Sequence, residues 1–89
     1  MNINIPNGTP EYAVDAVAAQ TNAWGSKVLL GSQRSDGNTM DVKVVAAVSP
    51  QTMKALSLVL KRQVEYFEQK WGPINLPTEV LHNLGEEVG

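Results

Sequence analysis

The sequence predicts an α+β two-layer sandwich with the order β-α-β-β-α, in which two helices cover one face of a three-stranded sheet. Three observations predict it: a short alternating run opens the chain, two β-patterned runs flank a Ser-Asp-Gly turn, and a long capped helical pattern follows. With 89 residues, 43% of them hydrophobic and 18% charged, the composition is that of one globular domain. We therefore expect a single domain over 1–89, with its core in 1–73 and an extension over 74–89 whose end is frayed.

The first strand and the first helix are predicted from the start of the chain. Residues 2–5 alternate polar and apolar side chains, which favours a short strand ended by a turn over residues 6–8. Thr9 then offers a hydroxyl N-cap, with proline at the first helical position. Apolar side chains at helical spacing lead to Trp24, which we assign to the core, and Gly25 ends this predicted helix.

A hairpin is predicted next, because residues 27–34 and 38–48 are rich in apolar and β-branched side chains and flank the Ser-Asp-Gly turn. A two-residue loop would place Leu30 opposite Lys43 and give a face of mixed character. A three-residue loop with Gly37 in the left-handed conformation gives one continuous apolar face, so we predict this register. It pairs Val28 with Val44, Leu30 with Val42, and Ser32 with Met40.

A long second helix is predicted to begin after the cap Ser49 and to run to about Trp71, where Gly72 and a proline end it. Six large apolar side chains fall on one narrow stripe at 100° per residue, which predicts a core face. They are Met53, Leu56, Leu60, Val64, Phe67 and Trp71. A short helix is predicted over 78–84, and the position of the first strand in the sheet stays open.

Most catalytic chemistries are excluded by the residues that the chain lacks. Without cysteine there is no disulfide, thiolate metal site or thiol nucleophile, and the one histidine, His82, has only Glu79 at helical spacing beside it. No glycine-rich loop opens a helix, and no serine has an obvious base. We predict no enzyme activity, no cofactor and no metal site. With no apolar run of export or membrane-spanning length visible, we expect a cytoplasmic protein without membrane contact.

The charge is uneven along the chain, although the net formal charge is only −2. Residues 26–63 hold six basic against two acidic side chains, a net +4, and the flanking segments are acidic. A nucleic-acid-binding accessory protein is therefore the alternative function. Its candidate contact residues are Arg34, Lys43, Lys54, Lys61 and Arg62.

Apolar side chains without a place in the predicted core are the more informative feature. Leu29 and Val45 would lie on the uncovered face of the hairpin, and Ala55, Val59 and Tyr66 form a second line beside the helical stripe. Two outcomes follow, which can hold together: residues 74–84 fold back over the aromatic end of the long helix, and a partner chain covers it.

These side chains predict a small protein-protein interaction module that acts as a stoichiometric regulator, inhibitor or accessory subunit, such as phages and mobile elements use. We expect it to self-associate, as a homodimer. The predicted partner-binding residues, with aromatic anchors first, are Tyr66, Trp71, Val59, Ala55, Leu29 and Val45.

Overall fold

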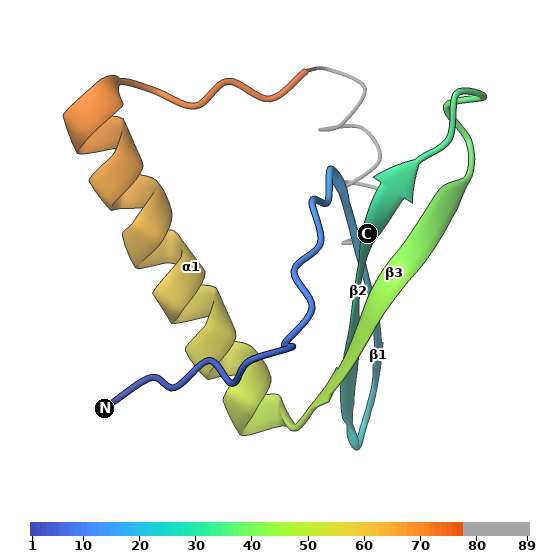
Figure 1. The fold of residues 1–89 in the computed structure, drawn as a ribbon, viewed down its shortest axis with the longest axis horizontal. Helices are drawn as coiled ribbons and strands as arrows, with labels where there is room; N and C mark the ends of the chain where they lie inside the picture. Colours follow the sequence, from blue (N-terminus) through green and yellow to red (C-terminus); the bar gives the residue numbers. More distant parts are fainter. Residues whose placement is uncertain (78–89) are drawn as a thin grey trace.

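The chain folds into a three-stranded antiparallel sheet followed by one helix, as seen in a computed structural model that describes residues 1–77 (Figure 1). The strands are β1 (Ala16–Asn22), β2 (Gly25–Gln33) and β3 (Met40–Val48), and the helix is α1 (Pro50–Trp71). Neighbouring strands in the chain are neighbours in the sheet, which has the order β1-β2-β3. The predicted α+β class is confirmed, but the predicted order β-α-β-β-α with two helices is wrong. The predicted helix over 78–84 lies outside the described residues.

The first predicted strand and the first predicted helix are both absent, since residues 1–15 hold neither. The turn over residues 6–8 does form, and it explains why Thr9 caps no helix. Both the N–H and the hydroxyl of Thr9 donate to the carbonyl oxygen of Pro6, at 3.1 and 2.7 Å. The hydroxyl therefore closes the turn, and it does not accept from a following helical N–H as an N-cap would.

Strand β1 occupies the alanine-rich stretch that the sequence assigned to a helix. It pairs antiparallel with β2 from Ala16 opposite Gly31 to Asn22 opposite Gly25. Asp15 extends this pairing: its backbone N–H donates to Gly31 O, and its carboxylate Oδ1 accepts the Gln33 N–H, each at 3.0 Å. The alanines favour a helix locally, but ladder hydrogen bonds to β2 outweigh that weak preference.

Trp24 is not in a core, contrary to prediction. It lies in the two-residue loop between β1 and β2, where its backbone N–H donates to Oδ1 of Asn22 at 2.8 Å. Its side chain is 89% exposed.

The β2–β3 hairpin is confirmed, but its predicted register is wrong. Val28 lies opposite Ala46 and Leu30 opposite Val44, and the register shifts by one residue between Leu30 and Gly31. The shift leaves Lys43 as the extra residue of a β-bulge.

The side chain of Asp36 explains the register at the turn. Gly37 has the predicted positive φ of 76°, but Oδ1 of Asp36 accepts the N–H groups of Asn38 and Thr39 at 2.8 and 3.0 Å. Cross-strand pairing therefore starts one residue later than predicted, where Arg34 N–H donates to Thr39 O at 2.8 Å.

Helix α1 has the predicted limits. The side chain of Ser49 accepts the Thr52 N–H at 3.2 Å, a proline follows the cap, and Gly72 ends the helix with a φ of 103°. Each of these signals is local, so the helix is specified without reference to the sheet.

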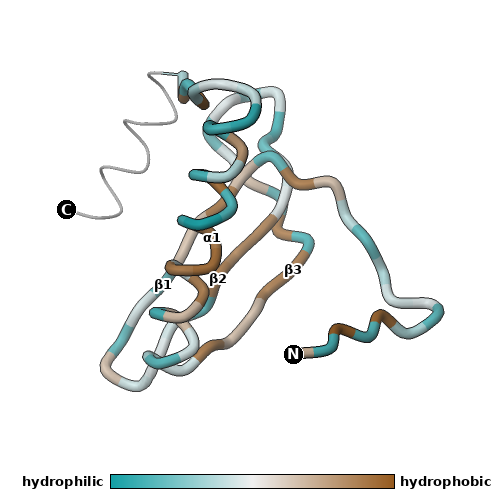
Figure 2. Tube along the Cα trace, turned by 90° about the vertical axis from the view of Figure 1, so that its left-hand side faces the viewer, coloured by the Kyte–Doolittle hydropathy of each residue, from teal (hydrophilic) through white to brown (hydrophobic). Residues whose placement is uncertain are grey.

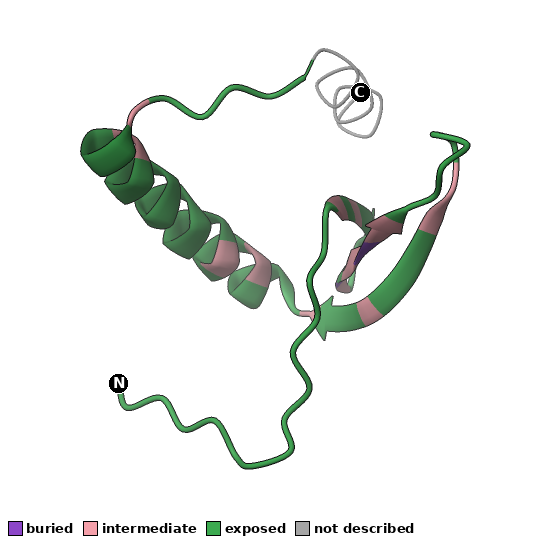
Figure 3. Cartoon of the chain, turned by 45° about the horizontal axis from the view of Figure 1, so that its top comes forward, coloured by how far each residue is buried: buried purple, intermediate pink, exposed green. Residues whose placement is uncertain are grey.

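No hydrophobic side chain of residues 1–77 is buried (Figure 3). Helix α1 meets the sheet at its N-terminal end, where the hydroxyl of Ser26, 5% exposed, donates to Sδ of Met53 at 2.8 Å. Beyond this contact the helix and the sheet diverge in a V (Figure 1). The radius of gyration is 14.8 Å, against about 12 Å for a compact chain of this length.

The predicted core face of α1 is therefore left exposed by the part of the chain that the structure describes. Leu60 is 54% exposed, Phe67 44% and Trp71 64%. The accessible surface is 7886 Å², roughly 2,800 Å² more than the ~5,000 Å² typical of a compact monomer of its mass.

Candidate functional site

The apolar side of α1 is the first candidate surface. We call it the helix stripe, and it consists of Met53, Leu56, Leu60, Val64, Phe67 and Trp71. Met53 and Leu56 are half-buried near the sheet, and the other four are exposed. The stripe thus becomes more accessible along the helix, away from the point where the V closes.

The sheet offers a matching apolar face. Ser26 contacts α1, so Val28 and Leu30 lie on the same side of β2, because alternate residues of a strand share a face. Their cross-strand partners complete what we call the inner sheet face. It consists of Val17, Ala19, Val28, Leu30, Val44 and Ala46. Figure 2 shows hydrophobic segments along β2, β3 and α1.

An aromatic cluster closes the C-terminal end of the helix stripe. The ring centroids of Phe67 and Trp71 lie 5.1 Å apart, and those of Tyr66 and Trp71 6.2 Å apart in an edge-to-face arrangement. Lys70 Nζ lies 5.5 and 5.3 Å from the Tyr66 and Trp71 ring centroids and donates to the Tyr66 hydroxyl at 3.2 Å. These contacts restrict the rotamers of side chains that are all still exposed to water. Binding through them therefore costs little side-chain entropy.

The six predicted partner-binding residues lie on two separate surfaces. Tyr66 and Trp71 come together in the aromatic cluster, and Val59 and Ala55 continue along the same helix, with Val59 53% exposed. The remaining two, Leu29 and Val45, face each other across β2 and β3 on the side of the sheet opposite the inner face, with Val45 56% exposed.

The five basic residues of the alternative prediction do not form one patch. Arg34 is paired with Asp41, with Nη2 and Oδ1 2.8 Å apart and Nε 2.9 Å from both carboxylate oxygens. Lys43 Nζ donates to the carbonyl oxygen of Ala13 at 3.5 Å. On α1, Lys54 and Lys61 share one flank and Arg62 lies on another, at 100° per residue.

Two carboxylates of the β2–β3 turn have lowered pKa values. The pKa of Asp36 is lowered chiefly by the bond from the Asn38 N–H and next by the Thr39 hydroxyl. The pKa of Asp41 is lowered chiefly by its hydrogen bond with Arg34. Both ionised groups therefore stabilise the turn above the ordinary aspartate pKa of about 3.9. That contribution is lost as the pH falls through the lowered pKa values of the folded state.

We expect these lowered values to be measurable by NMR titration of the carboxyl carbons. Thr39→Ala should raise the pKa of Asp36 and leave that of Asp41 in place, because the hydroxyl bond of Thr39 is lost. Arg34→Gln should do the reverse, so each variant is the control for the other. Ordinary values for both groups in the unaltered chain would contradict the turn geometry.

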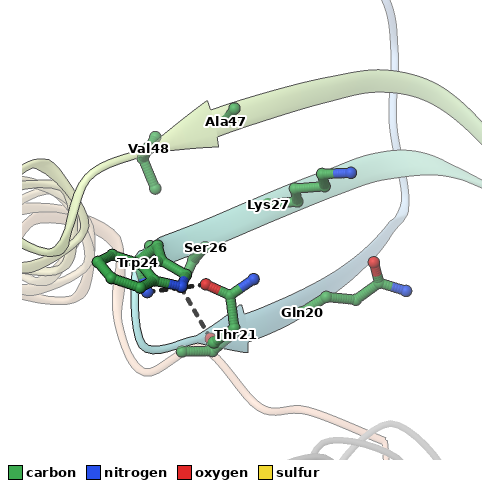
Figure 4. Close-up of a pocket in the computed structure, with 9 residues that line it drawn as sticks. Gln20, Thr21, Trp24, Ser26, Lys27, Ala47 and Val48 are labelled. Carbon is green, nitrogen blue, oxygen red and sulfur yellow. Dashed lines mark hydrogen bonds between the residues drawn. The ribbon is translucent and has the colours of Figure 1, made fainter.

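A shallow depression of about 320 Å³ lies beside the β1–β2 loop (Figure 4). Trp24 borders it, together with the hydroxyls of Thr21 and Ser26, which lie 2.8 Å apart. The apolar pattern of the sequence did not predict Trp24 as a surface residue. The signal for a turn at Trp24 was Asn22, because an asparagine side chain often accepts the backbone N–H two residues later, and Gly25 follows.

The described part of the chain holds no group of three or more histidine, cysteine, aspartate or glutamate side chains that could bind a metal ion. Glu79 and His82, which the sequence places at helical spacing without further ligands, lie outside it. In residues 1–77 no helix has the length and apolar character needed to cross a bilayer.

The evidence for function therefore comes from this chain's own surfaces. Comparison of the chain with protein-family models, with curated proteins and with solved structures finds no match.

Proposed function

We propose that this protein is a protein-protein interaction module that acts by stoichiometric contact, as a regulator, an inhibitor or an accessory subunit of a larger assembly, and that it also self-associates. The observation that carries the proposal is the absence of any buried hydrophobic side chain in residues 1–77. Two apolar surfaces, the helix stripe and the inner sheet face, diverge without covering each other. Exposed apolar surface of this extent is typical of a binding site.

The surface available is sufficient for a stable complex. A standard interface removes about 800 Å² from each partner, and this chain exposes roughly 2,800 Å² more than a compact monomer. If about 60% of an 800 Å² patch is apolar, burying it gains about 12 kcal/mol on this chain alone. Association costs about 4–15 kcal/mol, and the partner's own buried surface contributes a further gain.

Tyr66 is the side chain whose removal best tests the proposal. Tyr66→Ala is expected to weaken capture of the partner by about 30-fold or more, the loss typical of a hot spot. The fold should persist, because Tyr66 is 54% exposed and its aromatic contact lies within its own helix. The measurement is affinity capture from a native lysate with the immobilised full chain, followed by titration of the captured protein.

Gln69→Ala is the matched control, since Gln69 is an exposed residue of the same helix turn on the side away from the helix stripe. It should leave capture unchanged. Equal capture by the Tyr66→Ala variant, or unfolding of that variant, would remove Tyr66 as an anchor.

The nucleic-acid alternative has less support. The charge of Arg34 is engaged by Asp41, and the helix lysines lie on a different element from Lys43. Binding to DNA or RNA that weakens steeply with added salt would favour the alternative, and no detectable binding at low salt would eliminate it.

A further inference from the structure

We infer that the helix stripe is covered by the same stripe of a second copy of this chain, with the two α1 helices antiparallel and crossing near Arg62. This inference rests on the proposed function, since it names the partner of the stripe. It leaves the line of Ala55, Val59 and Tyr66 at the border of the dimer contact, where a different partner can still reach it.

The helix stripe is self-complementary when its direction is reversed. Met53 and Trp71 lie equally far from Arg62, as do Leu60 and Val64, and Leu56 and Phe67 nearly so. In an antiparallel pair of α1 helices, each stripe residue therefore faces an apolar stripe residue of the second copy. The pairs are Met53 with Trp71, Leu60 with Val64, and Leu56 with Phe67 of the second copy.

The charges beside the stripe favour the same arrangement. Lys54, Lys61, Glu65 and Glu68 lie within about 60° of one another on one flank of α1, at 100° per residue. Antiparallel helices bring this flank against itself in reverse. Lys54 then lies near Glu68 of the second copy and Lys61 near Glu65, and symmetry repeats both pairs. Lys61 also lies near Lys61 of the second copy at the crossing, so four attractive contacts stand against one repulsive contact.

A parallel pair would not match these charges. It would set this flank against the other one, which carries Gln63 and Lys70 and no acidic residue. Lys54 and Lys61 would then meet no carboxylate.

These four charges are available for contacts between chains. Within residues 1–77 the ion pair found is Arg34 with Asp41, and none of the four takes part in one. Glu68 accepts the Ile74 N–H through Oε2 at 3.0 Å, which leaves Oε1 for a lysine of the second copy.

The dimensions of α1 also suit a second copy. A helix of 22 residues is about 33 Å long, and the stripe extends over nearly all of it. The second copy's Phe67 and Trp71 would lie beside the half-buried Met53 and Leu56, at the end of the stripe nearest the inner sheet face.

The test begins with the mass of the full chain in solution, measured by analytical ultracentrifugation over a wide concentration range. We expect a mass twice that of the 9.6 kDa chain. Lys54→Glu with Lys61→Glu should weaken the dimer at least tenfold, because the flank then repels itself. Glu65→Lys with Glu68→Lys should do the same.

Two further samples report on the direction of the helices. An equimolar mixture of the two double variants should form a heterodimer, and a single chain with all four changes should regain the homodimer. Lys27→Glu with Arg62→Glu is the control, because it changes the net charge equally at two positions away from the flank, and it should leave the dimer intact.

A chain that stays monomeric at every concentration would overturn the inference, and the capture experiment with Tyr66→Ala would then decide the proposed function separately. A dimer that Leu60→Asp dissociates but the flank charges do not affect would overturn the antiparallel arrangement. A monomer destabilised equally by Leu60→Asp and Leu81→Asp would assign the cover of the stripe to residues beyond 77 and overturn the second copy as its occupant.

Discussion

Gly31→Ala is expected to abolish the β2–β3 hairpin and, with it, the fold. A Cβ atom at this position would overlap the carbonyl oxygen of Asp41 and lie 2.8 Å from its carbonyl carbon and 2.9 Å from Cα of Val42. All three are backbone atoms of β3, held close by the bulge, so no side chain can rotate away. We expect a loss of about 3 kcal/mol or more, which is at the upper end of the effects of single substitutions.

Circular dichroism and amide NMR spectra of the variant provide the measurement. Gln69→Ala is the control, since Gln69 is an exposed residue of α1 away from the hairpin. Its spectra should match those of the unaltered chain. A Gly31→Ala variant with intact cross-strand amide signals would show that β3 does not approach β2 at the bulge as described.

The unfolding midpoint is expected to depend on protein concentration, because residues 1–77 bury no hydrophobic side chain within one chain and gain most of their burial on association. A tenfold increase in concentration stabilises a dimer by about 1.4 kcal/mol, or about 0.7 kcal/mol per chain. For a domain of this size the midpoint should rise by about 3–5 °C. Calorimetry over a hundredfold concentration range would measure it.

The loss of stability caused by Leu60→Ala tells whether the helix stripe is buried in a dimer or exposed in an isolated chain. In an isolated chain Leu60 is 54% exposed, so its loss should cost under about 1 kcal/mol. Under a second helix the same change removes a buried side chain and should cost about 2–5 kcal/mol per chain. A small cost together with a midpoint independent of concentration would contradict burial of the stripe.

The difference between α1 and β1 shows which elements local sequence could predict. Helix α1 is bounded by Ser49 and Gly72, whose hydrogen bonds reach only a few residues along the chain, so its limits follow from sequence. The stretch that became β1 has the alanines of a helix, and only pairing with β2 makes it a strand. Thr9 was wrongly predicted as a helix N-cap, because its hydroxyl donates back to the carbonyl oxygen of Pro6 and does not accept from a following N–H.

The β2–β3 hairpin likewise has features that the sequence predicts and features that it does not. Its two apolar runs and the positive φ of Gly37 were predictable from composition and turn chemistry. Its register was not, because Asp36 binds two backbone N–H groups and the bulge at Lys43 shifts the pairing again. Both effects depend on side-chain geometry that a pattern of apolar and polar residues does not contain.

The sequence by itself determined the long capped helix, the apolar stripe along it and the hairpin that precedes it, since each depends on periodicity and on contacts between residues close in the chain. Only the tertiary structure decided that residues 1–77 leave the stripe exposed, that β1 replaces a helix and that Trp24 lies at the surface. Burial depends on the angle between α1 and the sheet, which contacts between distant residues set, and here those contacts gather around Met53 and Ser26 at one end of the helix.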